Sequence, residues 1–163
     1  MRVFTITIPT SKPLTNYDIW RYVRELDIPH FRTVCMLDNL PSSIKPNENN
    51  ECGIVNFNKT GEKGSHWVAY YWKRGGQQQQ QQQRIYFDSF GQITPIEIQK
   101  YLKTREEFQQ NKSVIQRNTD IVQPINSSIC GHLCLFVLKA LSEGWSYQDI
   151  LNTLREEVST FTS

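Results

Sequence analysis

The sequence predicts a single α+β domain spanning residues 1–163. Segments with the 3.6-residue apolar spacing of helices alternate with short runs of β-branched and aromatic residues that are typical of strands. Hydrophobic residues make up 38% of the chain and charged residues 21%, a balance found in globular proteins. The sequence contains no internal repeat, and its length suits one domain with a real hydrophobic core.

The first predicted helix covers residues 15–26. Thr15 followed by Asp18 matches a capping box, and apolar residues then recur at helical spacing. Prolines among serines and asparagines predict a long irregular connection after this helix, at Pro29, Pro41 and Pro46.

Three strand-like runs follow, at residues 53–57, 66–72 and 84–88. Residues 58–65 contain Gly61 and Gly64 and predict a turn between the first two strands. The second and third strands are separated by a glutamine-rich stretch at residues 75–83. A tract without apolar residues cannot contribute to a core, so we expect it to be an insertion in a hairpin loop, with an interaction segment as the alternative.

The second half of the chain predicts three further helices and two short strands. Thr94, Pro95 and Glu97 suit the N-cap, N1 and N3 positions of a helix that ends near residue 102 or 108. Residues 114–116 and 121–123 are strand candidates. We expect a central, buried helix over residues 130–143, capped by Ser127 or Ser128 and closed by Gly144, and an amphipathic helix beginning at Ser146, with Asp149 completing a capping box.

Charge and hydropathy exclude several classes of function. The net charge is +2, and no run of Lys and Arg concentrates it, so any DNA binding is expected to be weak. No segment approaches the roughly 18 apolar residues of a membrane helix, and the first residues lack the apolar core of a secretory signal. We therefore expect an intracellular protein, with no membrane partner, whose four cysteines are reduced.

Cys130 is the candidate nucleophile. It opens a helix, where unpaired N–H groups and the positive end of the helix dipole favour the thiolate over the thiol. The alternative is a small buried hydrophobe, which is the interpretation we adopt for Cys134, one turn deeper in the same helix. A metal site formed by Cys130, His132 and Cys134 is a weaker idea, because His132 points to another side of the helix. We expect no metal and no cofactor.

His66 is the candidate base and Asp88 its partner. A single histidine in a strand is often structural. Here, however, the next predicted strand along the chain ends in Asp88, which could pair with His66. If the two strands pair as a hairpin, Asp88 can accept the ring N–H of His66, fix its tautomer and support the imidazolium. Gln123 can supply a side-chain amide to an oxyanion hole, together with the backbone N–H of Cys130.

Taken in order, these residues carry a family resemblance. His66-Trp67, then residues 87–91 (FDSFG), Gln123 and residues 126–131 (NSSICG) resemble the adenovirus-type cysteine endopeptidases, or adenains. Related enzymes are encoded by Maverick/Polinton elements and other DNA viruses, and the SUMO and ubiquitin-like proteases are more distant relatives with the same residue order. The resemblance covers about residues 15–141. In papain-like enzymes the catalytic Cys precedes the catalytic His in the sequence, so the residue order found here disfavours that family.

The resemblance implies a fold and a set of roles. The fold is the cysteine protease fold of the adenain and SUMO-protease kind, a small central sheet packed on a buried helix that bears the nucleophile. His66, Asp88 and Cys130 would form the triad, Gln123 and the backbone of Cys130 the oxyanion hole, and Trp67 the aromatic wall of the substrate cleft. The expected activity is cleavage after glycine-containing motifs in viral or mobile-element capsid and core precursors, as in virion maturation.

Two features depart from the adenovirus pattern. Adenovirus enzymes carry glutamate where this chain has Asp88, whereas the SUMO-type relatives use aspartate. An activating viral peptide is an expected type of partner, but no cysteine lies between Asp88 and Cys130 to hold it by a disulfide as in adenovirus. The resemblance also leaves open action in the host nucleus, in the cytoplasm or inside virions.

Two other functions fit the same residues. One is a SUMO- or ubiquitin-like-specific protease, which the catalytic residues alone cannot distinguish from a precursor-processing enzyme. The other is a catalytically idle interaction module on the same fold, a reading that the intact set of His66, Asp88, Gln123 and Cys130 disfavours.

Overall fold

The structure is a computed structural model that describes residues 1–44, 49–58, 66–75, 82–124 and 126–162. Its helical elements are α1 (Asn16–Leu26), η1 (Leu37–Asn39), α2 (Ile96–Leu102), α3 (Arg105–Gln109), α4 (Cys130–Ser142) and α5 (Tyr147–Thr162). The strands are β1 (Arg2–Val3), β2 (Ile6–Thr7), β3 (Phe31–Met36), β4 (Asn50–Asn56), β5 (Trp67–Lys73), β6 (Gln83–Phe87) and β7 (Gln116–Arg117). In this part of the chain no helix is long and apolar enough to cross a membrane.

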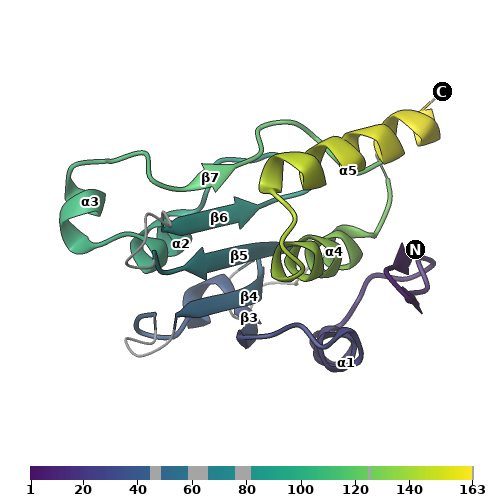
Figure 1. Cartoon of the computed structure of the whole chain (residues 1–163), viewed down its shortest axis with the longest axis horizontal. Coiled ribbons are helices and arrows are strands. Elements are labelled where there is room, and N and C mark those ends of the chain that lie inside the picture. The colour runs from purple at the N-terminus through teal and green to yellow at the C-terminus, as the bar shows by residue number, and fades with distance from the viewer. Residues whose placement is uncertain (45–48, 59–65, 76–81, 125, 163) are drawn as a thin grey trace.

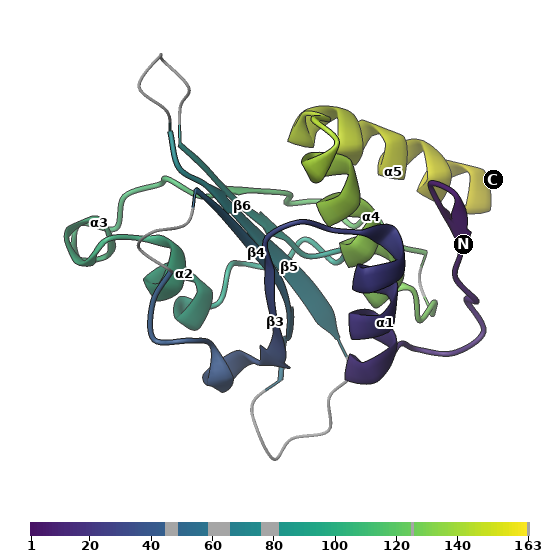
Figure 2. The ribbon, with the colours of Figure 1, turned by 60° about the horizontal axis from the view of Figure 1, so that its bottom comes forward.

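One mixed sheet organises the molecule (Figure 1). Its strand order is β3-β4-β5-β6-β7; β5 is antiparallel to both β4 and β6, and the edge strands β3 and β7 pair in parallel with β4 and β6. Helices α1, α4 and α5 lie on one side of the sheet, and α2 and α3 lie on the other, as Figure 2 shows. The prediction of an α+β architecture is confirmed.

Alternation along β5 builds two cores, one on each face of the sheet. Trp67, Ala69 and Tyr71 join the core shared with α1, α4 and α5. Val68, Tyr70 and Trp72 join the second core, which packs under α2. Because both faces are covered, β5 is buried from Trp67 to Trp72 and lies at the centre of the protein.

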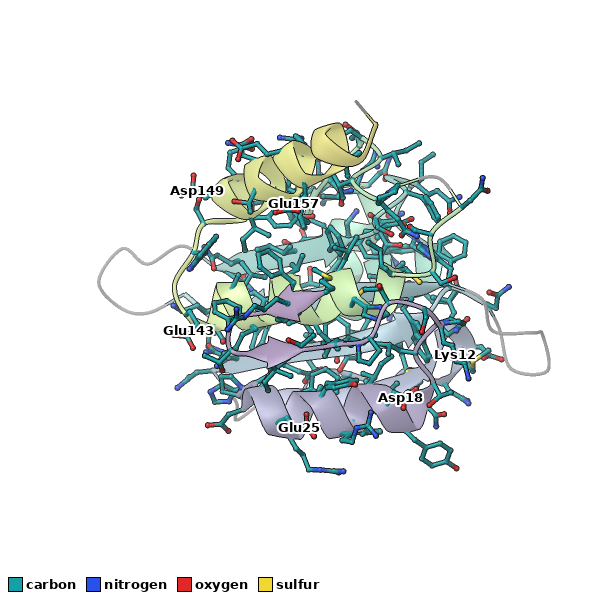
Figure 3. The ribbon with its side chains drawn as sticks, turned by 90° about the vertical axis from the view of Figure 1, so that its right-hand side faces the viewer. Lys12, Asp18, Glu25, Glu143, Asp149 and Glu157 are labelled. Atoms are coloured by element: carbon teal, nitrogen blue, oxygen red, sulfur yellow. The ribbon has the colours of Figure 1, made fainter. Side chains whose placement is uncertain are left out.

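Helix α4 is the buried centre of the larger core. It lies between α1 and α5, and the N-terminal strands lie over it in Figure 3. Phe4 of the short β1–β2 turn stacks on Phe136 of α4 with ring centroids 5.9 Å apart. The helix ends at Ser142, one residue before the predicted end, and Gly144 closes it as predicted: its φ of +92° lets the Trp145 N–H turn back to the Ala140 carbonyl.

Local signals predicted several helix boundaries correctly. Thr15 and Asp18 form the reciprocal capping box at the start of α1, and the Ser146 hydroxyl accepts from the Asp149 N–H at the start of α5. The glutamine-rich loop connects two paired strands, since Lys73 of β5 lies opposite Gln83 of β6. Most of that loop (76–81) and of the predicted turn (59–65) lies outside the described residues.

Other predictions were wrong. The region predicted to be irregular contains β3, an edge strand that pairs in parallel with β4, so its partner lies far along the chain. Residues 121–123 form no strand; the Val122 N–H instead donates to the Ser89 carbonyl.

The helix start at Thr94 was also placed too early. Pro95 occupies the N-cap of α2, and Thr94 is buried. Helix α2 ends at Leu102, and a separate helix, α3, begins with a capping box made by Thr104 and Glu107.

Candidate active site

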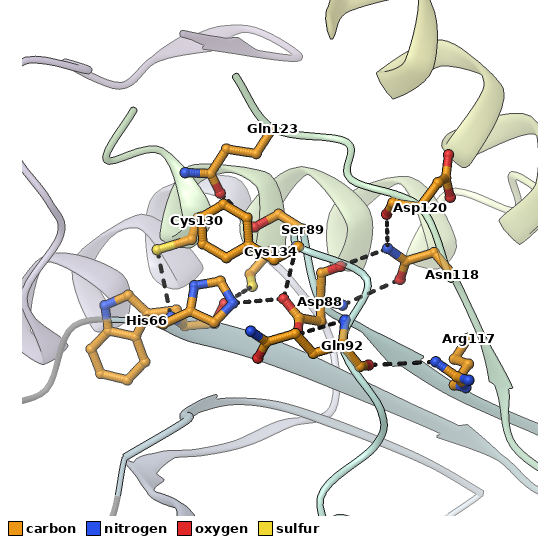
Figure 4. A network of polar contacts seen from close by, with 12 residues as sticks. His66, Asp88, Ser89, Gln92, Arg117, Asn118, Asp120, Gln123, Cys130 and Cys134 are labelled. Carbon is orange, nitrogen blue, oxygen red and sulfur yellow. Dashed lines mark hydrogen bonds and ion pairs between the residues drawn. The ribbon is translucent and has the colours of Figure 1, made fainter. Parts of the chain in front are cut away.

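His66 and Asp88 meet where two antiparallel strands end. His66 immediately precedes β5, Asp88 immediately follows β6, and the start of one strand lies beside the end of the other. The His66 Nε2 atom lies 2.6 Å from Asp88 Oδ1, and both residues are buried. The predicted pairing is therefore present in the structure (Figure 4).

The Asp88 carboxylate is fixed by its own turn. Its Oδ1 also accepts from the Phe90 N–H at 2.9 Å, and its Oδ2 accepts from the Gln92 N–H at 3.3 Å. The Phe90 ring lies against the imidazole of His66, with ring centroids 4.7 Å apart. These contacts leave the imidazole little freedom to rotate.

This arrangement favours a charged imidazole. Burial alone would lower the pKa of His66, but the hydrogen bond to Asp88 and the proximity of Cys130 outweigh burial and raise the pKa to about 9. Nδ1 of the same ring is buried and has no hydrogen-bond partner within the described part of the chain. Because Nε2 is held by Asp88, Nδ1 is the ring atom that can exchange a proton with Cys130 or a substrate.

Cys130 is the first residue of α4 and faces this pair. Burial raises the pKa of its thiol, but His66 and the backbone N–H groups of Trp67 and Gly131 reverse the effect, so the net pKa is lowered. The Trp67 N–H lies 3.5 Å from the sulfur.

The other cysteines behave differently. Burial raises the pKa of Cys35, of Cys52 and, most strongly, of Cys134, whose S–H donates to the Trp67 carbonyl. Cys130 is thus the thiol of the four that is poised to ionise.

The predicted serine cap of α4 is absent. Ile129 occupies the N-cap without a side-chain hydrogen bond from the described residues, and the Ser127 hydroxyl donates to the Pro124 carbonyl instead. An uncapped helix start keeps its first N–H groups free of a side-chain oxygen. Those groups are then available to a thiolate or to an oxyanion, which explains why a cap would be unfavourable here.

Gln123 has both ends of its amide held. Its Oε1 accepts from the Ser89 hydroxyl at 2.5 Å, and its Nε2 donates to the Ser127 carbonyl at 2.7 Å. An amide nitrogen carries two hydrogens, so one remains for a further acceptor. Gln123 lines the same cleft as Cys130 and His66.

The cleft has a volume of about 800 Å³ and is bordered by α1, β3, β5 and the start of α4. Trp67 forms part of its wall, with its indole N–H donating to the Leu14 carbonyl at 2.8 Å. Apart from the candidate catalytic residues His66 and Cys130, the side chains that line the cleft are uncharged. Sequence reasoning missed the contributions of β3 to this wall, those of Val34, Cys35 and Met36.

The alternative metal site is not assembled. His132 is buried, and its Nε2 donates to the Pro9 carbonyl at 2.6 Å, whereas Cys134 bonds the backbone of Trp67. No group of three or more His, Cys, Asp or Glu side chains suited to a metal ion occurs within the described ranges.

Two residues that support the site were also missed. Ser89 bonds Gln123 from the turn that carries Asp88, and the Asn118 side chain bonds both backbone groups of Asp88. These contacts join positions at least 30 residues apart, so no local sequence pattern predicts them.

No protein-family model matches the chain, and no curated protein matches it either. Among solved structures, the crystal structure of the ASFV pS273R protease matches with a TM-score of 0.55 at 18% sequence identity. That match covers 91% of this chain and 65% of the other. A selenomethionine crystal structure of the same protease matches with a TM-score of 0.44 at 21% identity, covering 64% of this chain and 39% of the other.

The chain therefore spans less than two thirds of the length of the proteases that it resembles. At this level of identity the first match establishes the fold. The fold predicted from the sequence is confirmed: this chain has an α+β fold of the SUMO-protease-like cysteine protease kind.

Proposed function

We propose that this chain is a cysteine endopeptidase. Cys130 is the nucleophile, His66 the acid and base, Asp88 the group that orients and charges His66, and Gln123 with the Cys130 N–H the oxyanion hole. The observation that carries the proposal is the convergence of a thiol with a lowered pKa and a carboxylate-paired imidazole in one cleft.

Acylation follows from this geometry. The Cys130 thiolate attacks the carbonyl carbon of the scissile peptide, and the carbonyl π electrons move to oxygen, where the amide donors stabilise the negative charge. The protonated Nδ1 of His66 then delivers its proton to the leaving amine nitrogen as the C–N bond breaks. An acyl thioester on Cys130 remains.

Deacylation returns the enzyme to its starting state. Neutral His66 takes a proton from water at Nδ1 while the water oxygen attacks the thioester carbonyl. Collapse of this second tetrahedral intermediate breaks the C–S bond, releases a carboxylic acid and restores the thiolate–imidazolium pair. Asp88 stays ionised throughout and stabilises the charged ring in both half-reactions.

The proposal extends to substrate. The bonds cut are those after glycine-containing motifs, and the substrates are capsid or core precursors of a virus or mobile element inside the host cell or the virion. A cleft whose lining is uncharged apart from His66 and Cys130 suits an extended segment with small, uncharged side chains, since a substrate charge buried there would lose its hydration. The resemblance to adenains supports this choice of substrate.

The second candidate is a protease specific for SUMO or ubiquitin-like proteins; the SUMO-type relatives use aspartate at the position of Asp88, and the catalytic residues do not distinguish this candidate from the first. A panel of purified ubiquitin-like fusions and capsid precursors distinguishes the two. Turnover of the fusions alone would favour the second candidate over the first.

Labelling with a thiol-directed electrophilic peptide probe tests the activity itself. We expect stoichiometric labelling and peptide cleavage by the unmodified chain, and neither by Cys130→Ala. Cys35→Ala is the matched control, because Cys35 borders the same cleft but burial raises its pKa. Cleavage that survives in purified Cys130→Ala would overturn the proposal.

A further inference from the structure

Ser89 lies beside the candidate catalytic groups without being one of them. It is fully buried in the turn that follows β6, directly after Asp88. Its hydroxyl donates to Gln123 Oε1 at 2.5 Å, and its carbonyl accepts from the Val122 N–H at 2.8 Å. Ser89 therefore holds both the side chain of Gln123 and the backbone just before it (Figure 4).

The orientation of an amide decides whether it can serve an oxyanion. A glutamine presents a donor nitrogen or an acceptor oxygen depending on a rotation of the amide plane by 180°. If Gln123 turned its oxygen into the cleft, that oxygen would repel a developing negative charge. Two contacts set the orientation found here: the Ser127 carbonyl, which can only accept and so requires the amide nitrogen, and the Ser89 hydroxyl, which donates its hydrogen to the amide oxygen.

Burial makes this selection strong. Gln123 is 1% exposed and Ser89 0%, so no bulk water is present to replace either contact. The rotated amide would place its oxygen against the Ser127 carbonyl, and the hydrogen of the Ser89 hydroxyl would lose the Gln123 oxygen as its acceptor. Buried polar groups that lose their partners in this way are unfavourable by roughly 1–3 kcal/mol each.

We propose that Ser89 is a positioning residue that aims the Gln123 amide nitrogen at the oxyanion and couples the oxyanion hole to the turn of Asp88. This inference rests on the proposed function. Ser89 touches no reacting atom and acts through Gln123. One short turn then positions both the carboxylate that stabilises protonated His66 and, through Ser89, the amide that donates to the oxyanion.

The kinetic test compares Ser89→Ala with the unmodified chain in three reactions. Hydrolysis of a fluorogenic peptide should fall about tenfold in kcat with little change in KM, less than the roughly 100-fold that follows loss of a whole oxyanion donor. The affinity of a peptide aldehyde, which forms a tetrahedral adduct with the thiol, should fall by a similar factor. Alkylation of Cys130 by iodoacetamide involves no oxyanion and should be unchanged.

A double-mutant cycle tests the route of the effect. If Ser89 acts through Gln123, then Ser89→Ala combined with Gln123→Ala should be no slower than Gln123→Ala alone. Ser89→Cys, which keeps the size and a weak donor, should recover part of the loss. An additional tenfold loss in the Gln123→Ala background, or a parallel loss of alkylation, would overturn the proposal.

A readout independent of activity separates this inference from the proposed function. The side-chain N–H₂ signals of Gln123, assigned in a ¹⁵N–¹H spectrum by their absence in Gln123→Ala, should show slow hydrogen exchange in the unmodified chain. In Ser89→Ala they should exchange faster, whereas the signals of Gln148, an exposed residue, should not change. Unchanged Gln123 signals would refute the positioning role even in a chain that cleaves nothing.

Discussion

Asp88→Asn removes a charge while keeping the shape of the site. The asparagine oxygen can still accept from His66 Nε2 and from the Phe90 N–H, the two shorter bonds made by Asp88 Oδ1. The contact that is lost, from Oδ2 to the Gln92 N–H, is a long one at 3.3 Å. We therefore expect the variant to fold and the effect to fall on the protonation of His66.

The magnitude follows from the pKa of His66. Asp88 and Cys130 together raise that pKa to about 9 against the effect of burial. A return to the ordinary value near 6.5 corresponds to about 3 kcal/mol less stabilisation of the imidazolium. The equilibrium between the thiolate–imidazolium pair and the neutral thiol–imidazole pair would shift about 100-fold towards the neutral pair, and kcat/KM should fall by up to this factor.

Two assays check this result. Initial rates of peptide hydrolysis give kcat/KM, and the rate of Cys130 alkylation against pH reports the thiolate. In the unmodified chain alkylation should change little around neutral pH, whereas in Asp88→Asn it should rise towards alkaline pH as the thiol ionises without its partner. Asp88→Glu should recover part of the activity, and Asp149→Asn, on the exposed face of α5, is the control for loss of one surface carboxylate. Equal kcat/KM and the same alkylation profile in Asp88→Asn and the unmodified chain would remove Asp88 from the mechanism.

Three further predictions can be checked directly. The pH profile of kcat/KM should be bell-shaped. It should fall above about pH 9 because His66 loses its proton, and it should fall in acid because the Cys130 thiolate, whose pKa is lowered, is protonated. A profile still rising at pH 10 would contradict this prediction. Deleting residues 76–81 should leave the melting temperature within a few degrees and kcat nearly unchanged, because Lys73 and Gln83 already pair across the hairpin; failure to fold would show that the tract is structural. Valine in place of the glycines flanking the cut should block turnover and Trp67→Ala should relax this preference, with thermal melting as the control for lost packing; a peptide library without glycine enrichment would refute this specificity.

The parts of the structure that could be predicted from the sequence are those determined by contacts between residues close together in the chain. Thr15 and Asp18 mark a helix start through contacts three residues apart. His66 and Asp88 could be paired because a hairpin brings the beginning of one strand to the end of the next. The start of a helix at Cys130 was predicted from the polar residues before it; the start is correct, although Ile129 and not a serine occupies the N-cap.

The parts that were missed depend on partners far along the chain. Strand β3 exists because it can pair with β4, not because residues 31–36 show a clean alternation; each of its residues is half-buried. Ser127 looked like a cap, but its hydroxyl is engaged by the Pro124 carbonyl. Ser89 and Asn118 are ordinary polar residues until the fold places them against Gln123 and Asp88.

The candidate active site is assembled from the ends of elements, and α5 determines how firmly those ends are held. The Asn118 side chain bonds the backbone of Asp88, and the Tyr147 hydroxyl of α5 lies within hydrogen-bond distance of Asn118 Oδ1 and of the Tyr86 carbonyl. Arg155, two turns further along α5, pairs with Asp120 through two contacts. The segment that leads to Gln123 is thus held by a helix none of whose described side chains lines the cleft. Because segments without regular structure are held only by such contacts, packing of α5 against the sheet is part of what keeps the oxyanion donor and the His66–Asp88 pair in register.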